Sequence, residues 1–322
     1  MKENSKRIAK NTLYLYVRML FTMLVSLYTV RLVLNVLGLI DYGIFNVVGG
    51  IVVMFSFLSN TMASTSQRFL AYEIGRNNLL QLKKTFNMTV IIYVIISVVI
   101  LILAETLGLW FLNNKMVIPV QRIEAANWIY HFTIFSFIIN ILMIPYNALI
   151  IAREDMKVYA YIGVIEVLFR LVIVYLLTII LYDKLKVYAV LIFIITCLIS
   201  LLYGVYCKKK YKESQLQLYW NKKLFKTLIS FSGWNLFGGI AGVFNNQGVN
   251  ILLNIFFGPV INAARGIAFQ VNTAINQFVL NFTVAVNPQI TKYYALGENK
   301  EMISLVFKSS KFSYFLLLTL SI

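Results

Sequence analysis

The feature that most constrains this chain is a series of long apolar segments, each close to the length needed to cross a lipid bilayer. A membrane-spanning helix needs about 20 mostly apolar residues. Eight segments of the 322-residue chain meet that requirement, and a ninth begins near Phe312. The eight are roughly residues 12–37, 42–62, 86–112, 126–151, 159–181, 187–206, 231–257 and 261–286. Because 60% of the residues are hydrophobic and only 13% are charged, the sequence predicts an all-α, polytopic membrane protein.

The positions of the basic residues predict the topology. Nineteen lysines and arginines fall in segments on the side of the spans that holds the N-terminus, and five fall on the opposite side. By the positive-inside rule, the N-terminus is predicted to be cytoplasmic, and the protein is expected in a bacterial cytoplasmic (inner) membrane. Topology and anionic lipid then explain the formal net charge of +17, so nucleic-acid binding is not expected.

An internal repeat predicts two lobes. With a shift of 222 residues, Ala63–Asn78 aligns with Ala285–Lys300, including Gly75 with Gly297. Six spans separate the copies, so both start on the same side of the membrane, as in transporters with a parallel repeat around a central cleft. Chance similarity between membrane segments is the alternative. The predicted domains are an N-terminal lobe of six helices (1–212), a basic cytoplasmic linker (213–230), and the first three helices of an incomplete C-terminal lobe (231–322).

Arginines inside the predicted spans are candidate binding residues, because an ionisable group at membrane depth is costly. Arg18 and Arg31 lie in the first span, and Arg265 lies in the eighth. Arg31 and Arg265 fall in the outer halves of spans on opposite lobes, so both could face one cleft. Guanidinium groups bind diphosphates bidentately, which makes the three arginines candidate contacts for a phosphorylated head group. Snorkelling to the membrane surface is the alternative, above all for Arg18.

Other polar residues in the spans have two interpretations each. Glu166 and Arg170 are four residues apart on one helix face, which predicts an internal ion pair or a gate whose pairing changes. Glu105 and His131, the only histidine, are candidates for proton or cation coupling, although an interhelical hydrogen bond is the simpler expectation for His131.

Amides in the seventh and eighth predicted spans are expected to line a hydrophilic cleft suited to sugar hydroxyls. Asn246, Asn250 and Gln270 are the candidates named here. Pro288 is expected to end the eighth span.

Motifs of known catalytic chemistry are missing from the sequence. We find no GxxxxGK[ST] loop, no HExxH, no paired cysteine ligands and no nucleophile elbow. We therefore predict no catalytic residue, no enzyme activity, no metal site and no cofactor.

Several segments resemble the polysaccharide-export (O-antigen flippase) branch of the multidrug/oligosaccharidyl-lipid/polysaccharide (MOP) exporter superfamily. They are LGLIDYGIFNVVGG (37–50), GWNLFGGIAG (233–242), NIFFGPVINAARGIAFQVN (254–272) and NPQI (287–290). The resemblance implies a MATE-like fold of two six-helix lobes, of which this chain would lack the last spans. It also implies alternating access of a cationic cleft that flips undecaprenyl-pyrophosphate-linked oligosaccharide for surface polysaccharide biosynthesis.

The partners expected from this resemblance are lipid-linked oligosaccharide, membrane lipid and polysaccharide-assembly proteins. Two other functions stay open. A cation-coupled multidrug exporter would favour an acidic, aromatic chamber, whereas acidic residues are scarce in these spans. A membrane glycosyltransferase or polymerase would call for a large outer loop, and every predicted outer loop is short.

Overall fold

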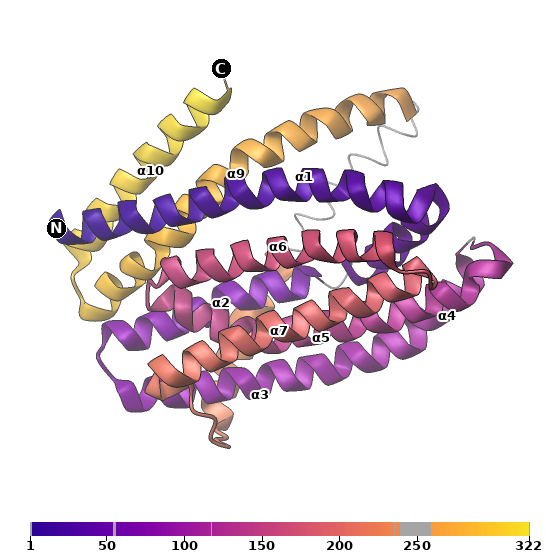
Figure 1. The fold of residues 1–322 in the computed structure, drawn as a ribbon. Helices are drawn as coiled ribbons and strands as arrows, with labels where there is room; N and C mark the ends of the chain where they lie inside the picture. The colour runs from indigo at the N-terminus through magenta and orange to yellow at the C-terminus, as the bar shows by residue number, and fades with distance from the viewer. Residues whose placement is uncertain (1, 54–55, 117, 235, 239–258, 322) are drawn as a thin grey trace.

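A computed structural model describes residues 2–53, 56–116, 118–234, 236–238 and 259–321, and these residues are helical apart from short turns and the linker after residue 210 (Figure 1). The helices are α1 (Lys2–Val53), α2 (Ser56–Gly75), α3 (Leu79–Leu103), α4 (Leu109–Lys115), α5 (Ile123–Ala152), α6 (Met156–Ile179), α7 (Lys184–Lys210), α9 (Pro259–Leu296) and α10 (Asn299–Ser321). Short helical turns are η1 (Ala104–Gly108), η2 (Val120–Arg122) and η3 (Lys212–Ser214), and residues 222–234 are also helical.

Six helical segments of the described chain are long and apolar enough to cross a membrane, and they correspond to the first, third to sixth and ninth predicted segments. They are Asn4–Gly38, Leu79–Lys115, Val120–Ala152, Met156–Ile179, Lys184–Lys210 and Asn299–Ser321. Within the predicted linker, a helix begins at residue 222. The ninth helix likewise begins at Asn299, well before Phe312.

Gly38 and Pro288 both lie inside long helices, and each affects its helix differently. Gly38 has φ 78° and ψ 170°, so α1 changes direction there and its remainder forms the start of the second predicted span. The prediction that Pro288 ends its span is wrong, because α9 continues beyond it to Leu296. A proline removes a single backbone donor and can be accommodated by a kink, so the helix resumes after it.

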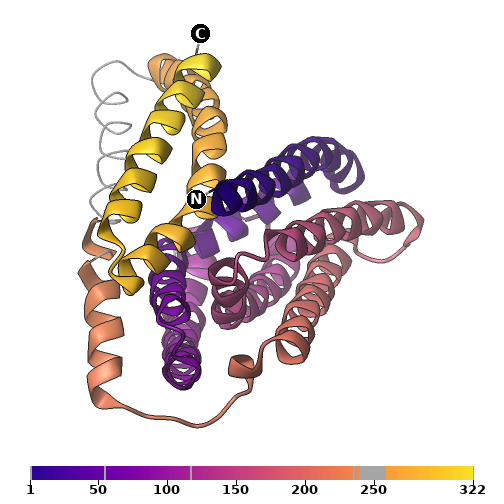
Figure 2. The same ribbon diagram turned by 90° about the vertical axis from the view of Figure 1, so that its left-hand side faces the viewer.

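The helices lie side by side with their turns at two ends of a bundle (Figure 1). We call one of these the basic end: it holds the N-terminus, the α2–α3, α5–α6 and α9–α10 turns, and the end of α7. These are the segments that the positive-inside rule groups on one side. Viewed from this end, α9 and α10 form a group beside the group of α1–α7 (Figure 2). We refer to the group of α1–α7 as the first lobe and to the group of α9 and α10 as the second lobe.

The N-terminal lobe is held together by a buried apolar core. Fully buried residues of its four central helices, such as Leu70, Phe86, Leu149 and Leu177, belong to one cluster. Many large apolar residues point outward, as expected where helices face lipid tails instead of water.

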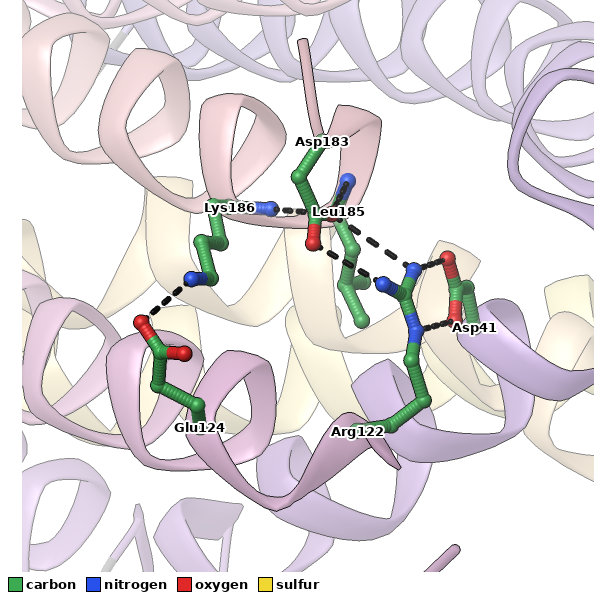
Figure 3. Close-up of polar contacts among 6 residues, drawn as sticks. All are labelled: Asp41, Arg122, Glu124, Asp183, Leu185 and Lys186. Carbon is green, nitrogen blue, oxygen red and sulfur yellow. Dashed lines mark hydrogen bonds and ion pairs between the residues drawn. The ribbon is translucent and has the colours of Figure 1, made fainter. Parts of the chain in front are cut away.

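An ion-pair network ties the N-terminal lobe at the end opposite the basic end (Figure 3). Arg122 donates from Nε to Asp41 Oδ1 at 2.7 Å and from Nη1 to Asp183 Oδ2 at 2.8 Å. Lys186 Nζ pairs with Glu124 at 2.6 Å nearby. Because these residues come from α1, from the turn before α5, and from the start of α7, the network fixes three parts of one lobe to each other.

The structure also contains the predicted repeat, but in a different register. Asn77 (φ 52°) and Gly297 (φ 76°) each follow a helix, and each donates its N–H to the carbonyl three residues back, at 3.1 Å in both cases. The next residue donates to the carbonyl five residues back, which completes the same Schellman-type cap at both sites. From 77 to 297 is 220 residues, and the helix starts at Leu79 and Asn299 have the same separation. The identical letters at a shift of 222 therefore do not mark equivalent positions.

The two copies of the repeat also touch each other. A Cβ added at Gly75 would lie 2.9 Å from the Cβ of Ala295, which is its equivalent at a shift of 220. The contact of α2 with α9 therefore joins the two repeats.

Candidate functional site

A cavity of about 790 Å³ lies between α1 of the first lobe and α9 of the second. Each helix contributes a polar stripe with four-residue spacing, which places the side chains on one helix face. The stripes consist of Arg18, Thr22 and Ser26 on α1 and Thr273, Gln277 and Asn281 on α9. Apolar side chains such as Met19, Met23 and Phe278 complete the lining. The described residues of the cavity thus offer one cation, several hydroxyl and amide groups, and apolar surface.

Arg18 provides the positive charge of this cavity. Its guanidinium carbon lies 4.2 Å from the centroid of the Tyr159 ring, in a cation–π contact. A Cβ at Gly163 would lie 2.5 Å from Arg18 Nε, so the absence of a side chain there makes room for the guanidinium. Arg18 is therefore held against α6 where it lines the cavity, and snorkelling to the membrane surface stays the alternative prediction.

Of the other predicted binding residues, only Arg31 has a side chain among the described residues. Arg31 is exposed and is not among the lining residues. Arg31 follows Arg18 by thirteen positions, so on an ideal helix the two side chains point about 140° apart around the helix axis. Arg265 and Gln270 belong to α9 but their side chains lie outside the described residues, as do Asn246 and Asn250 entirely. Their contact with a substrate stays a prediction.

The structure contains the predicted Glu166–Arg170 pair and a hydrogen-bond partner for His131. Arg170 Nη2 donates to Glu166 Oε1 at 2.8 Å on a partly exposed face of α6. His131 Nδ1 lies 3.0 Å from Glu105 Oε1, which confirms a hydrogen bond between neighbouring spans. Glu105 belongs to the π-helical turn η1, a feature that is often found near functional sites. A gating or coupling role for these four residues stays a prediction.

A cluster of polar residues that the sequence did not reveal joins the lobes at the basic end, and we call it the Glu154 cluster (Glu154, Arg7, Gln289 and Lys292). Glu154 lies in the α5–α6 turn with φ 61°, and its side chain is 1% exposed. Its carboxylate accepts from Arg7 Nε at 2.7 Å, from Gln289 Nε2 at 2.9 Å, and from Lys292 Nζ. Because Gln289 and Lys292 belong to α9, one buried carboxylate connects the two lobes.

The neighbours of Glu154 anchor the same turn to other parts of the first lobe. Arg153 Nε donates to Glu213 in η3 at 2.8 Å. Asp155 accepts from Lys210 Nζ at 2.5 Å and from Tyr211 Oη at 2.9 Å. Burial raises the pKa of the Asp155 carboxyl, but hydrogen bonds from Lys210 and two tyrosine hydroxyls outweigh burial and hold this pKa below its usual value. The residues before and after Glu154 are thus both held by hydrogen bonds, which fixes the position of the turn from which Glu154 reaches α9.

Packing of α2 against α9 reinforces the contact between lobes at the basic end. Gly75 lies against Ala295 and the backbone of Lys292, and the rings of Tyr72 and Tyr294 lie with centroids 6.1 Å apart. Together with the Glu154 cluster, this packing holds the lobes together on the basic side of the cavity.

Comparison with known proteins identifies the family. Residues 8–294 match the family model for "Polysaccharide biosynthesis protein". The chain belongs to this polysaccharide biosynthesis protein family. No curated protein matches its sequence directly.

Solved structures share the fold of this polysaccharide biosynthesis protein at low sequence identity. An outward-facing multidrug resistance MATE family transporter of the MOP superfamily has a TM-score of 0.84 and 12% identity, over 98% of this chain and 70% of that chain. A MOP superfamily transporter from Pyrococcus furiosus has a TM-score of 0.81 and 14% identity, over 98% and 70%. A variant of the Vibrio cholerae MATE transporter VcmN has a TM-score of 0.75 and 13% identity, over 97% and 70%. The predicted MATE/MOP fold of a multi-pass membrane protein is therefore confirmed.

Proposed function

We propose that this protein is a transporter, and not an enzyme, that flips undecaprenyl-pyrophosphate-linked oligosaccharide across the bacterial cytoplasmic membrane. The observation that carries the proposal is Arg18 in a cavity with two polar stripes, between the two lobes of a polysaccharide biosynthesis family member. A cavity with one well-packed guanidinium favours an anionic group, and a diphosphate must shed water to enter a membrane protein.

The remaining lining fits the other parts of such a cargo. Gln277 and Asn281 offer amide donors and acceptors to sugar hydroxyls. Met19 and Met23 offer flexible apolar surface beside an isoprenoid chain. The volume of about 790 Å³ suits a head group of modest size, with room for more when the lobes separate.

The contacts at the basic end suggest how transport would proceed. The positive-inside rule assigns this end to the cytoplasm, so the Glu154 cluster and the α2–α9 contact would hold a state that is closed to the cytoplasm. A structural relative with TM-score 0.84 is described as outward-facing, which agrees with this assignment. Loading cargo from the cytoplasm would then require the carboxylate of Glu154 to release Gln289 and Lys292.

A cation-coupled multidrug exporter is the second candidate, because several structural relatives are MATE transporters. For the Pyrococcus furiosus relative, reverse polarity of the binding pocket is said to suggest a different function. Pocket charge thus offers a criterion for cargo within this fold. The cation in the cavity of this chain favours an anionic cargo.

The proposal is tested by complementation of the organism's own gene deletion, which matches the transporter to its sugar. Surface polysaccharide and lipid-linked precursor on the inner leaflet are measured at matched membrane abundance of each variant. We expect wild type to restore export, Arg18→Gln to fail with accumulated precursor, and Arg18→Lys to restore part of it.

Arg31→Gln is the matched control, since it removes an arginine of the same helix that lies outside the cavity. We expect it to restore export. Normal export by Arg18→Gln would contradict the proposed site. A deletion that changes drug sensitivity and leaves surface polysaccharide intact would favour the multidrug alternative.

A further inference from the structure

A second concave surface lies at the basic end, away from the inter-lobe cavity. It is a groove of about 820 Å³ between the start of α3, the end of α7 and η3. Four cations line it: Lys83, Arg153, Lys210 and Lys212. Leu79, Leu80 and Tyr211 also line it, and Glu213 is its one acidic lining residue. The groove therefore combines positive charge with apolar surface.

Two of the four cations are available to a ligand. Arg153 is paired with Glu213, and Lys210 is paired with Asp155. Lys83 of α3 and Lys212 of η3 form no ion pair with any carboxylate in the part of the chain that the structure describes. They come from different walls of the groove, so an anion between them would be approached from two sides.

The apolar residues beside these lysines face outward. Leu79 and Leu80 are 64% and 66% exposed. The linker that follows η3 runs around the outer side of α3 (Figure 2). Asn87 of α3 holds it there, by accepting from Gln217 N at 2.6 Å and donating to Gln215 O at 3.3 Å.

Alternate residues of this held linker point away from the protein. Leu216, Leu218 and Trp220 are all exposed, and Leu218 is fully so. In an extended segment, alternate side chains share one face. A row of Leu, Leu and Trp would be unfavourable in water but is suited to the lipid interface, where tryptophan is enriched.

We propose that this groove binds the head group of an anionic phospholipid of the cytoplasmic leaflet between Lys83 and Lys212, with the acyl chains against Leu79, Leu80 and the exposed face of the linker. Basic pockets between membrane helices on the cytoplasmic side are suited to anionic head groups. The neighbouring apolar surface favours a lipid over a soluble phosphate, which could not use it. The inference depends on membrane location and is independent of the cargo in the inter-lobe cavity.

Binding of short-chain phosphatidylglycerol to the purified full-length protein tests the proposal, with native mass spectrometry as the readout. Each lysine near an anionic lipid contributes a factor of about five, so Lys83→Gln/Lys212→Gln should weaken binding on the order of 30-fold. Lys222→Gln/Lys226→Gln is the matched control. It removes the same charge at the same end but outside the groove, and we expect a small change only.

Two further measurements keep a structural defect or a soluble ligand from giving the same result. Lys83→Arg/Lys212→Arg should retain binding, and glycerol phosphate should not displace the lipid at equal concentration. Equal losses in the groove and control pairs would overturn the proposal, because they would indicate diffuse attraction of the whole basic end. Displacement by glycerol phosphate would also overturn it, because the site would then recognise a soluble anion.

Discussion

Neutralising Glu154 should open the basic end of the protein. The side chain of Glu154 is 1% exposed and that of its partner Lys292 is 16% exposed, so Glu154→Gln leaves a buried ammonium without its carboxylate. Breaking a buried ion pair in this way costs about 3–5 kcal/mol. The Arg7 side chain is 50% exposed, so water replaces much of its contact and adds little to this figure.

The cost falls on the closed state, because Lys292 would be hydrated once α9 moves away from the α5–α6 turn. A shift of about 3 kcal/mol changes the ratio of closed to open states about 150-fold. A cysteine in place of Ala274, which lines the cavity, reports on opening. In Glu154→Gln, labelling of this cysteine by a maleimide in inside-out vesicles should be faster by one to two orders of magnitude. The change in the ratio of closed to open states sets the upper limit of this increase. Mass spectrometry of the peptide separates this label from any on Cys197 or Cys207.

Two additional variants identify the electrostatic cause. Glu154→Gln/Lys292→Gln removes the stranded cation as well, so its labelling should return most of the way to the slow rate. Glu124→Gln breaks an ion pair with Lys186 inside the first lobe, at the end opposite the basic end, so it should leave labelling unchanged. If Glu154→Gln labelled no faster than Glu124→Gln, the reasoning about the Glu154 cluster would be refuted.

The remaining predictions concern three other positions. Gly163→Val should displace the Arg18 guanidinium and reduce export to the level of Arg18→Gln, whereas Gly204→Val, where the structure has open space, should not. Gly75→Leu should speed labelling at position 274, since its Cβ would lie 2.9 Å from the Lys292 backbone, which cannot yield as a side chain would. Asp155 has a lowered pKa in the folded protein, so its stabilising contribution is present above the usual aspartate pKa and is lost as pH falls through the folded value. The thermal unfolding temperature of the solubilised protein should therefore fall less on acidification in Asp155→Asn than in wild type. An equal fall in both proteins would contradict this assignment.

The sequence alone predicted the features that a bilayer imposes on each segment separately. Span length and apolar content follow from membrane thickness, so the helices lie close to where hydropathy placed them. Charge counts grouped the loops that meet at the basic end. Local spacing predicted the Glu166–Arg170 pair, because residues four apart share a helix face. The hydrogen bond of His131 was expected for the same kind of reason, since a polar group at membrane depth needs a partner.

Only the tertiary structure decided which polar residues meet across the lobes. Glu154 contacts Arg7 and Lys292, which are 147 and 138 residues away in the chain. In the sequence, Arg7 and Lys292 counted only as basic residues of the loops, and Glu154 was not singled out. Helix rotation also separates Arg18 from Arg31, although both belong to one span. The sequence alignment gave a repeat shift of 222 residues, whereas the helix caps at Asn77 and Gly297 give 220. The cap marks the same backbone position in both copies, and identical residues nearby do not. Hydropathy reports on the environment of each segment, whereas contacts between lobes depend on helix rotation and on distant residues brought together by folding.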